Sequence, residues 1–128
     1  MASHLLDSDV LIWNWRGQQA AATLLAAQAF ALSAVSYMEL VQSMRNAREL
    51  KKLQSDLRLW RATLLPITEA ISLRAMRLVE QHYLSHHLQL ADALIAANAL
   101  THQIELVTSN TKHFQPIAGL KLVPYRAM

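Results

Sequence analysis

The sequence predicts an α/β sandwich with a mainly parallel central sheet. Short apolar runs of the kind that form buried strands alternate with longer segments of helical periodicity. Such a β–α–β–α order is typical of parallel sheets that are covered by helices. The chain has 128 residues, of which 53% are hydrophobic. We therefore expect one domain over residues 1–128, with a hydrophobic core of its own.

The first half of the chain contains two predicted strands, each followed by helices. In order, these elements lie at residues 4–6 (strand), 10–15 (helix), 18–27 (helix), 30–32 (strand), 33 or 36 to about 44 (helix) and 47–61 (helix). Gly17 separates the first two helices, and either Ser33 or Ser36 can cap the third. The last helix has one apolar face, which favours packing in the core or in a dimer: Leu50, Leu53, Leu57 and Trp60.

The second half of the chain continues the alternation with three further strands. In order, its elements lie at residues 63–67 (strand), 68 to about 83 (helix), 90–100 (helix), 105–107 (strand), 111–114 (helical turn) and 120–123 (strand). Pro66 and the turn after it end the first of these strands. The Ala-rich stretch "LADALIAANAL" predicts a buried helix.

Composition excludes several classes of protein. With only Gly17 and Gly119 as glycines, the chain cannot build a Gly-rich loop for phosphates or dinucleotides. The absence of cysteine excludes disulfides and Cys-based zinc sites, and it fits a cytoplasmic protein. No apolar stretch reaches the ~20 residues that span a bilayer. No basic residue precedes Arg16, so we expect neither a signal peptide nor a membrane contact.

Basic residues are concentrated in one part of the chain. The net charge is +3, and eight of the twelve basic residues lie between Arg45 and Arg77. This concentration indicates an anionic partner, with nucleic acid as the first candidate, although a solvated helix face gives the same pattern. Candidates for contact with a nucleic-acid backbone are Arg45, Arg48 and Lys51.

Three of the few acidic residues stand among apolar neighbours. Asp7 follows the first strand, Glu39 lies in the first turns after the second strand, and Asp92 opens the Ala-rich helix. Sites in open α/β sheets form at the carboxyl ends of the strands, where such carboxylates would converge. Buried carboxylates repel one another, and Mg²⁺ or Mn²⁺ would compensate their charge. The alternatives are ordinary ones: Asp7 and Asp92 as helix caps, and Glu39 as an exposed helical residue.

Four blocks of the sequence resemble PIN-domain proteins in order and spacing, and VapC-type toxins most of all. The blocks are "LLDSDVLIW", "ALSAVSYMELVQ", "LQLADALIAANAL" and "LVTSNTKHFQPIAGLKLV". The resemblance covers nearly the whole chain and implies a PIN-like α/β/α sandwich over residues 1–128. It further implies a Mg²⁺- or Mn²⁺-dependent endoribonuclease, the toxin of a type II toxin–antitoxin pair, which hydrolyses RNA phosphodiester bonds with a metal-activated water. The implied partners are an RNA substrate, a small cognate antitoxin and a second copy of the chain.

The resemblance also assigns roles to particular residues. Asp7, Glu39 and Asp92 take the positions of the metal-ligating catalytic acids, and Asn110 takes the fourth catalytic position. Many relatives have Asp at this fourth position, so whether Asn110 ligates a metal is open. Asp9 either caps the first helix or forms hydrogen bonds behind the ligands.

Histidines offer two further candidate roles. His82, His86 and His87 raise the possibility of a zinc site, but a surface turn explains them without a metal. His113, in the last block, either contacts RNA or is structural.

Two other functions compete with the nuclease. One is an inactive PIN-like module that binds RNA or protein, with Asn110 as the sign of lost activity. The other is a receiver-like signalling domain, which also carries acids at strand ends. A receiver needs a phosphoacceptor Asp with a Lys near the last strand and a Gly-bearing loop. Lys121 comes late and glycines are few, which disfavours it.

Overall fold

The computed structural model describes residues 4–15 and 29–125. The elements are β1 (His4–Leu6), α1 (Ser8–Trp15), β2 (Phe30–Ser33), α3 (Ala34–Gln42), α4 (Ala47–Leu59), β3 (Thr63–Leu65), α5 (Glu69–His86), α6 (Leu90–His102), β4 (Glu105–Thr108), α7 (Thr111–Phe114) and β5 (Leu122–Pro124). The predicted helix at 18–27 and the break at Gly17 lie outside the described residues.

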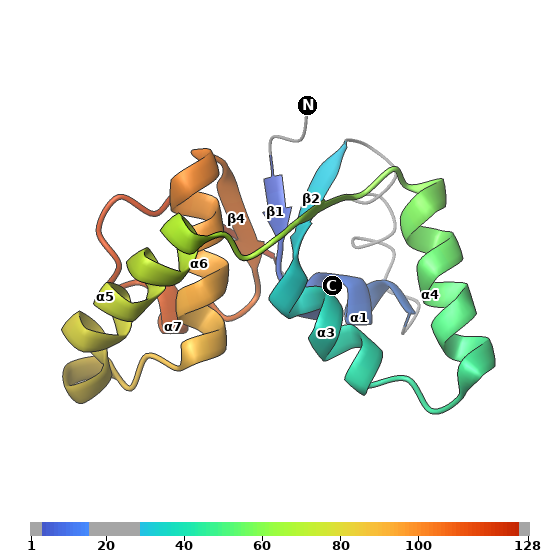
Figure 1. Ribbon diagram of the computed structural model, residues 1–128, viewed down its shortest axis with the longest axis horizontal. Coiled ribbons are helices and arrows are strands. Elements are labelled where there is room, and N and C mark those ends of the chain that lie inside the picture. The colour runs from blue at the N-terminus through green and yellow to red at the C-terminus, as the bar shows by residue number, and fades with distance from the viewer. Residues whose placement is uncertain (1–3, 16–28, 126–128) are drawn as a thin grey trace.

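The central sheet has five parallel strands in the order β3-β2-β1-β4-β5 (Figure 1). This arrangement confirms the predicted α/β sandwich with a parallel sheet. From β1 the chain first builds the sheet outward through β2 and β3, and then returns to add β4 and β5 on the other side. The strand order therefore reverses between β1 and β4, and in open α/β sheets binding sites form at such a point.

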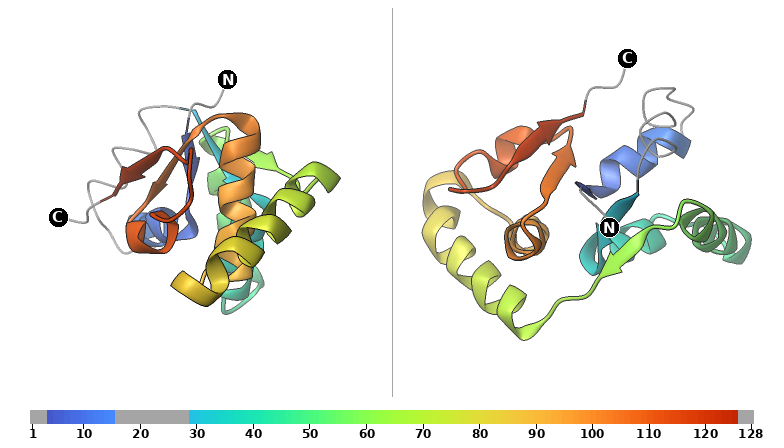
Figure 2. Two further views of the ribbon diagram at one scale, coloured as in Figure 1. Left: turned by 90° about the vertical axis from the view of Figure 1, so that its left-hand side faces the viewer. Right: turned by 90° about the horizontal axis from the view of Figure 1, so that it is seen from above.

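Helices cover both faces of the sheet, because successive strand residues point to opposite faces. On one face of the sheet, the strand residues Leu5, Ala31 and Leu106 pack in a hydrophobic core with α5 and α6. On the other face, the strand residues Leu6, Leu32 and Val107 pack with α1 and α4. Helix α5 lies along α6 on one side of the sheet (Figure 2). In the described part of the chain, no helix has the length and apolar character needed to cross a membrane.

Most predicted elements are confirmed to within two residues, but α5 is longer than predicted. Its sequence predicts an end near Tyr83 and a surface turn that holds the histidines, whereas the helix continues through His86. The prediction of a turn at His82 and His86 is therefore wrong, since nothing in this polar stretch breaks a helix. The helix ends at His87, whose left-handed backbone turns the chain so that Leu88 enters the core.

The predicted apolar face of α4 is confirmed as part of the core. Leu53 is fully buried, and Leu50, Leu57 and Trp60 pack against the same cluster. The ring of Trp60 lies against that of Phe30, with 6.4 Å between their centroids.

A buried polar link joins α6 to the end of β2. The hydroxyl of Ser33 accepts a hydrogen bond from the N–H of Val35 at 3.2 Å, so Ser33 rather than Ser36 caps α3. The same hydroxyl donates to Oδ1 of Asn98 at 2.7 Å. Asn98 is fully buried, and its Nδ2 donates to the carbonyl of Pro66 at 3.4 Å. Asn98 therefore fixes α6 against two strand ends.

Replacing Asn98 by alanine should lower the free energy of unfolding by about 2 kcal/mol, because the buried hydroxyl of Ser33 then has no acceptor for its proton and the carbonyl of Pro66 loses a donor. Urea unfolding measures this loss. The matched control is Asn110→Ala, since Asn110 is exposed and its change should stay within about 0.5 kcal/mol. Equal effects of the two variants would contradict a structural role for the Asn98 link.

Candidate functional site

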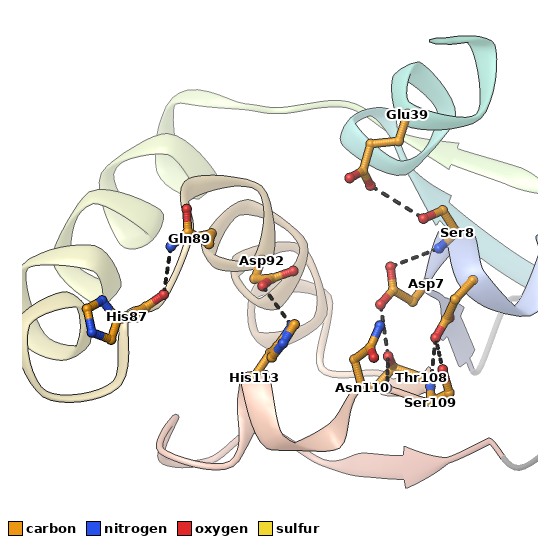
Figure 3. A network of polar contacts seen from close by, with 11 residues as sticks. Asp7, Ser8, Glu39, His87, Gln89, Asp92, Thr108, Ser109, Asn110 and His113 are labelled. Atoms are coloured by element: carbon orange, nitrogen blue, oxygen red, sulfur yellow. Dashed lines mark hydrogen bonds and ion pairs between the residues drawn. The ribbon is translucent and has the colours of Figure 1, made fainter. Parts of the chain in front are cut away.

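Asp7 lies at the carboxyl end of β1, at the point where the strand order reverses. Strand pairing places Leu6 opposite Val107, and the N–H of Asp7 extends this pairing by donating to the Val107 carbonyl at 3.0 Å. The side chain of Asp7 is 6% exposed. Its Oδ2 accepts a hydrogen bond from the Thr108 hydroxyl and its Oδ1 accepts one from the Ser8 N–H, both at 2.8 Å (Figure 3).

The surroundings of Asp7 make its charge costly. Burial, followed by the negative charge of Asp9, raises the pKa of the Asp7 carboxyl from 3.8 to about 7. The charge of Asp92 adds to this rise in pKa, while the hydrogen bonds from Thr108 and Ser8 oppose it. Desolvation therefore outweighs two good donors, and no Lys, Arg or His of the described residues forms an ion pair with this carboxylate.

Glu39 and Asp92 approach the same region from two helices (Figure 3). Glu39 projects from α3, and its Oε1 accepts a hydrogen bond from the Ser8 hydroxyl at 3.5 Å. Asp92 lies in the first turn of α6. Burial raises the pKa of both carboxyls, and the charge of Asp92 raises that of Glu39 further. The charge of Asp92 therefore acts on both of the other predicted acids.

The remaining predicted residues surround this cluster without joining it closely. Asn110 is exposed and precedes α7, and its N–H donates to the Thr108 hydroxyl at 3.0 Å. Asp9 does not cap a helix, because its Oδ2 accepts from Ser109 instead. Capping is also wrong for Asp92, since Gln89 occupies the N-cap position of α6.

The structure gives His113 a contact with the site that the sequence did not predict. Nδ1 of His113 lies 3.3 Å from Oδ2 of Asp92, and this pairing lowers the pKa of Asp92 against the effect of burial. The sequence places His113 only as a structural residue or an RNA contact. Its position in the same block as Asn110 was the available signal, because β4 brings that whole block to the site.

The donor set fits a hard divalent cation held in part through water. All three acids offer carboxylate oxygens, which such cations prefer, and their mutual repulsion favours a positive charge between them. Among the described residues, no three His, Asp or Glu side chains lie close enough to hold a metal ion by themselves. Mg²⁺ binds proteins through one or two carboxylates and keeps several waters, so this spacing suits it. The zinc alternative is not supported in the described part of the chain. His82 and His86 lie side by side on α5, with 6.1 Å between their ring centroids, but no third His, Asp or Glu joins them in a metal-binding group.

Comparison with known protein families shows which family this chain belongs to. The family model of the PIN domain matches residues 4–120. The chain belongs to the PIN-domain family. Among curated relatives, Ribonuclease VapC10 of Mycobacterium tuberculosis is 38% identical in an alignment 124 positions long, and the match covers 91% of this chain and 90% of that protein. The resemblance to VapC-type toxins seen in four sequence blocks is thereby confirmed.

Solved structures agree with the PIN-domain assignment. A toxin–antitoxin complex from Klebsiella pneumoniae contains a chain of 30% identity and a TM-score of 0.80, which covers 97% of this chain and 99% of its own length. VapBC2 from Rickettsia felis, bound to a promoter DNA fragment, has a chain with the same fold at 19% identity and a TM-score of 0.79, over 96% of this chain and 98% of that one. The receiver alternative loses its support, because receivers have the strand order 2-1-3-4-5.

The buried carboxyl of Asp7 predicts how stability depends on pH. Because its pKa is about 7 in the folded protein and 3.8 ordinarily, the folded state keeps a proton that the unfolded chain releases between these values. Stability present below pH ~4 should therefore be lost as the pH rises towards ~7, by at most about 4 kcal/mol. Urea unfolding in EDTA across this range measures the loss, and Asp7→Asn should flatten the curve. A curve with unchanged slope in Asp7→Asn would assign the dependence to other groups.

Proposed function

We propose that this PIN-domain protein is a metal-dependent endoribonuclease and the toxin of a type II toxin–antitoxin pair. The observation that carries the proposal is the buried carboxylate of Asp7 beside Glu39 and Asp92, whose pKa is raised by burial and by like charges, in a chain 38% identical to a ribonuclease. The toxin role is supported by the 30% identity to a chain of a toxin–antitoxin complex. Mg²⁺ or Mn²⁺ is the proposed cofactor, and hydrolysis of RNA phosphodiester bonds is the proposed reaction.

The residues of the site have distinct roles in this proposal. Asp7, Glu39 and Asp92 would hold the cation, in part through its waters. When bound, the cation supplies an acidified water and neutralises charge on the scissile phosphate. The Thr108 hydroxyl holds Oδ2 of Asp7, and His113 holds Oδ2 of Asp92, so that each carboxylate keeps one orientation.

Asn110 is the fourth catalytic residue of the proposal. Its backbone is held by Thr108, and its side chain is exposed and makes no capping hydrogen bond. Its amide can accept through oxygen and donate through nitrogen, so it suits a water or a phosphate oxygen at the mouth of the site. Loss of a carboxylate at this position weakens attraction for a second cation, which leaves the three acids as the metal ligands.

Partners follow from the same proposal. The substrate is RNA, the inhibitor is a small cognate antitoxin, and the protein itself is a homodimer. We place the activity in the cytoplasm, for which the absence of cysteine gives support.

Purified protein should cleave RNA in the presence of Mg²⁺ or Mn²⁺, and EDTA should stop the cleavage. Asp7→Asn and Asp92→Asn should each reduce the rate at least ~100-fold, because each removes a charge that acts on the reacting phosphate through the cation. A gel assay on labelled RNA measures all three effects.

The matched control for these variants is Glu80→Gln, which removes one exposed carboxylate from α5. It should cleave at the wild-type rate and so exclude an effect of net charge. Cleavage by Asp7→Asn at the wild-type rate would make the site assignment wrong. Metal-independent RNA binding without cleavage by the wild type would instead favour the inactive module.

The exposed face of α4 is the proposed surface for the RNA backbone. Arg45 and Lys52 are already paired with Glu49 and Asp56, at 2.9 Å and 3.1 Å. Arg48 and Lys51 are exposed. They lie on the side of α4 opposite its buried Leu53, as the helical spacing requires.

Replacing Arg48 and Lys51 together by Glu should weaken RNA binding on the order of tenfold at low salt, with the difference fading as salt rises. The reason is the loss of phosphate contacts, so KM should rise while kcat is kept. The matched control is Arg74→Glu with Arg77→Glu on α5, which makes the same charge change on another helix. If both double variants lost RNA affinity equally, the effect would come from the overall charge of the protein and not from contacts of α4.

A further inference from the structure

Asp9 is a fourth carboxylate beside the site, and the roles assigned so far do not use it. It lies in the first turn of α1, two residues after Asp7. Its Oδ2 accepts a hydrogen bond from the N–H of Ser109 at 2.9 Å and another from the Ser109 hydroxyl. Ser109 stands between Thr108, the last residue of β4, and Asn110, so the Asp9 side chain fastens α1 to the loop that follows β4.

These hydrogen bonds explain one oxygen of Asp9 but not its charge. An asparagine at the same place would offer a carbonyl oxygen to the same two donors of Ser109. The second oxygen of Asp9, Oδ1, is buried and has no hydrogen-bond partner among the described residues. A buried carboxylate oxygen without a partner is destabilising, so the negative charge has a cost that the link to Ser109 does not require.

The charge of Asp9 acts directly on the metal-ligating acids. The carboxylates of Asp9 and Asp7 are bonded to adjacent residues, Ser109 and Thr108, so their like charges lie close together. The charge of Asp9 also acts on Glu39. Within the described part of the chain, no Lys, Arg or His forms an ion pair with Asp9. The charge is therefore repulsive towards two carboxylates of the site, and what would make it favourable is a cation bound among them.

We propose that Asp9 is a positioning residue of the cation site: it holds the Ser109 loop through Oδ2, and its charge strengthens binding of a divalent cation that it does not itself ligate. This inference rests on the proposed metal dependence. Two charges that act across a partly buried site are coupled by an energy that corresponds to about tenfold or more in affinity.

The test is Mn²⁺ binding to the protein without RNA, measured by electron paramagnetic resonance or calorimetry. Asp9→Asn keeps the acceptor for Ser109 and removes the charge, so its Kd for Mn²⁺ should rise about tenfold. In EDTA, the same variant should resist urea better than the wild type, because repulsion of Asp7 and Glu39 is relieved. If Asp9 had a merely structural role, Asp9→Asn would lower both the stability in urea and the Mn²⁺ affinity, instead of raising the first and lowering the second.

Two controls complete the design. Ser109→Ala removes one hydrogen bond and keeps the charge of Asp9, so its Mn²⁺ affinity should stay within about twofold of the wild type, since only a neutral contact is lost. Glu80→Gln removes a distant charge and should bind Mn²⁺ like the wild type. Equal Mn²⁺ binding by Asp9→Asn and wild type would overturn the role of Asp9 alone. A wild type that binds no Mn²⁺ would overturn the proposed metal dependence, and this inference with it.

Discussion

The hydrogen bond between Thr108 and Asp7 is the contact on which the site depends. It joins the ends of β1 and β4, which are neighbours in the sheet but about a hundred residues apart in the chain. The same Thr108 hydroxyl accepts from the N–H of Asn110. One side chain therefore orients the most deeply buried carboxylate and the loop that follows β4.

A second contact sets the two helices that complete the cluster. Ser33 caps the helix that carries Glu39, and it is bonded to Asn98 on the helix that carries Asp92. The spacing of Glu39 and Asp92 is thus fixed by a fully buried hydrogen bond behind them, rather than by any contact between the two acids. Such an arrangement keeps like charges at a set distance even though they repel, and it leaves their oxygens available to a ligand.

Much of the fold could be predicted from the sequence because its signals are local. Short apolar runs located all five strands, and Ser33 was the correct one of two candidates for a helix cap. Strand order could not be read, since it depends on which buried edges pair. The end of α5 was missed because the polar stretch around His82 and His86 carries no residue that stops a helix.

The candidate site was also predicted only in part from the sequence. Asp7, Glu39 and Asp92 stood out as charges in apolar surroundings, and the resemblance to a known family supplied their shared purpose. The contacts of Asp9 with Ser109 and of His113 with Asp92 could not be predicted, because each joins side chains that only the folded sheet brings together. Sequence therefore identified groups that are costly to bury, whereas the groups that hold them in place required the structure.

The reversal of strand order between β1 and β4 also governs when the site can exist. Asp7 precedes β2 and β3 in the chain, but its partner Thr108 follows both of them. A growing chain that has folded β1, β2 and β3 still lacks the strand beside Asp7, together with the helical turn that carries His113. A growing chain therefore cannot hold Asp7 in its place until β4 has been synthesised, and it cannot pair Asp92 with His113 until α7 has followed.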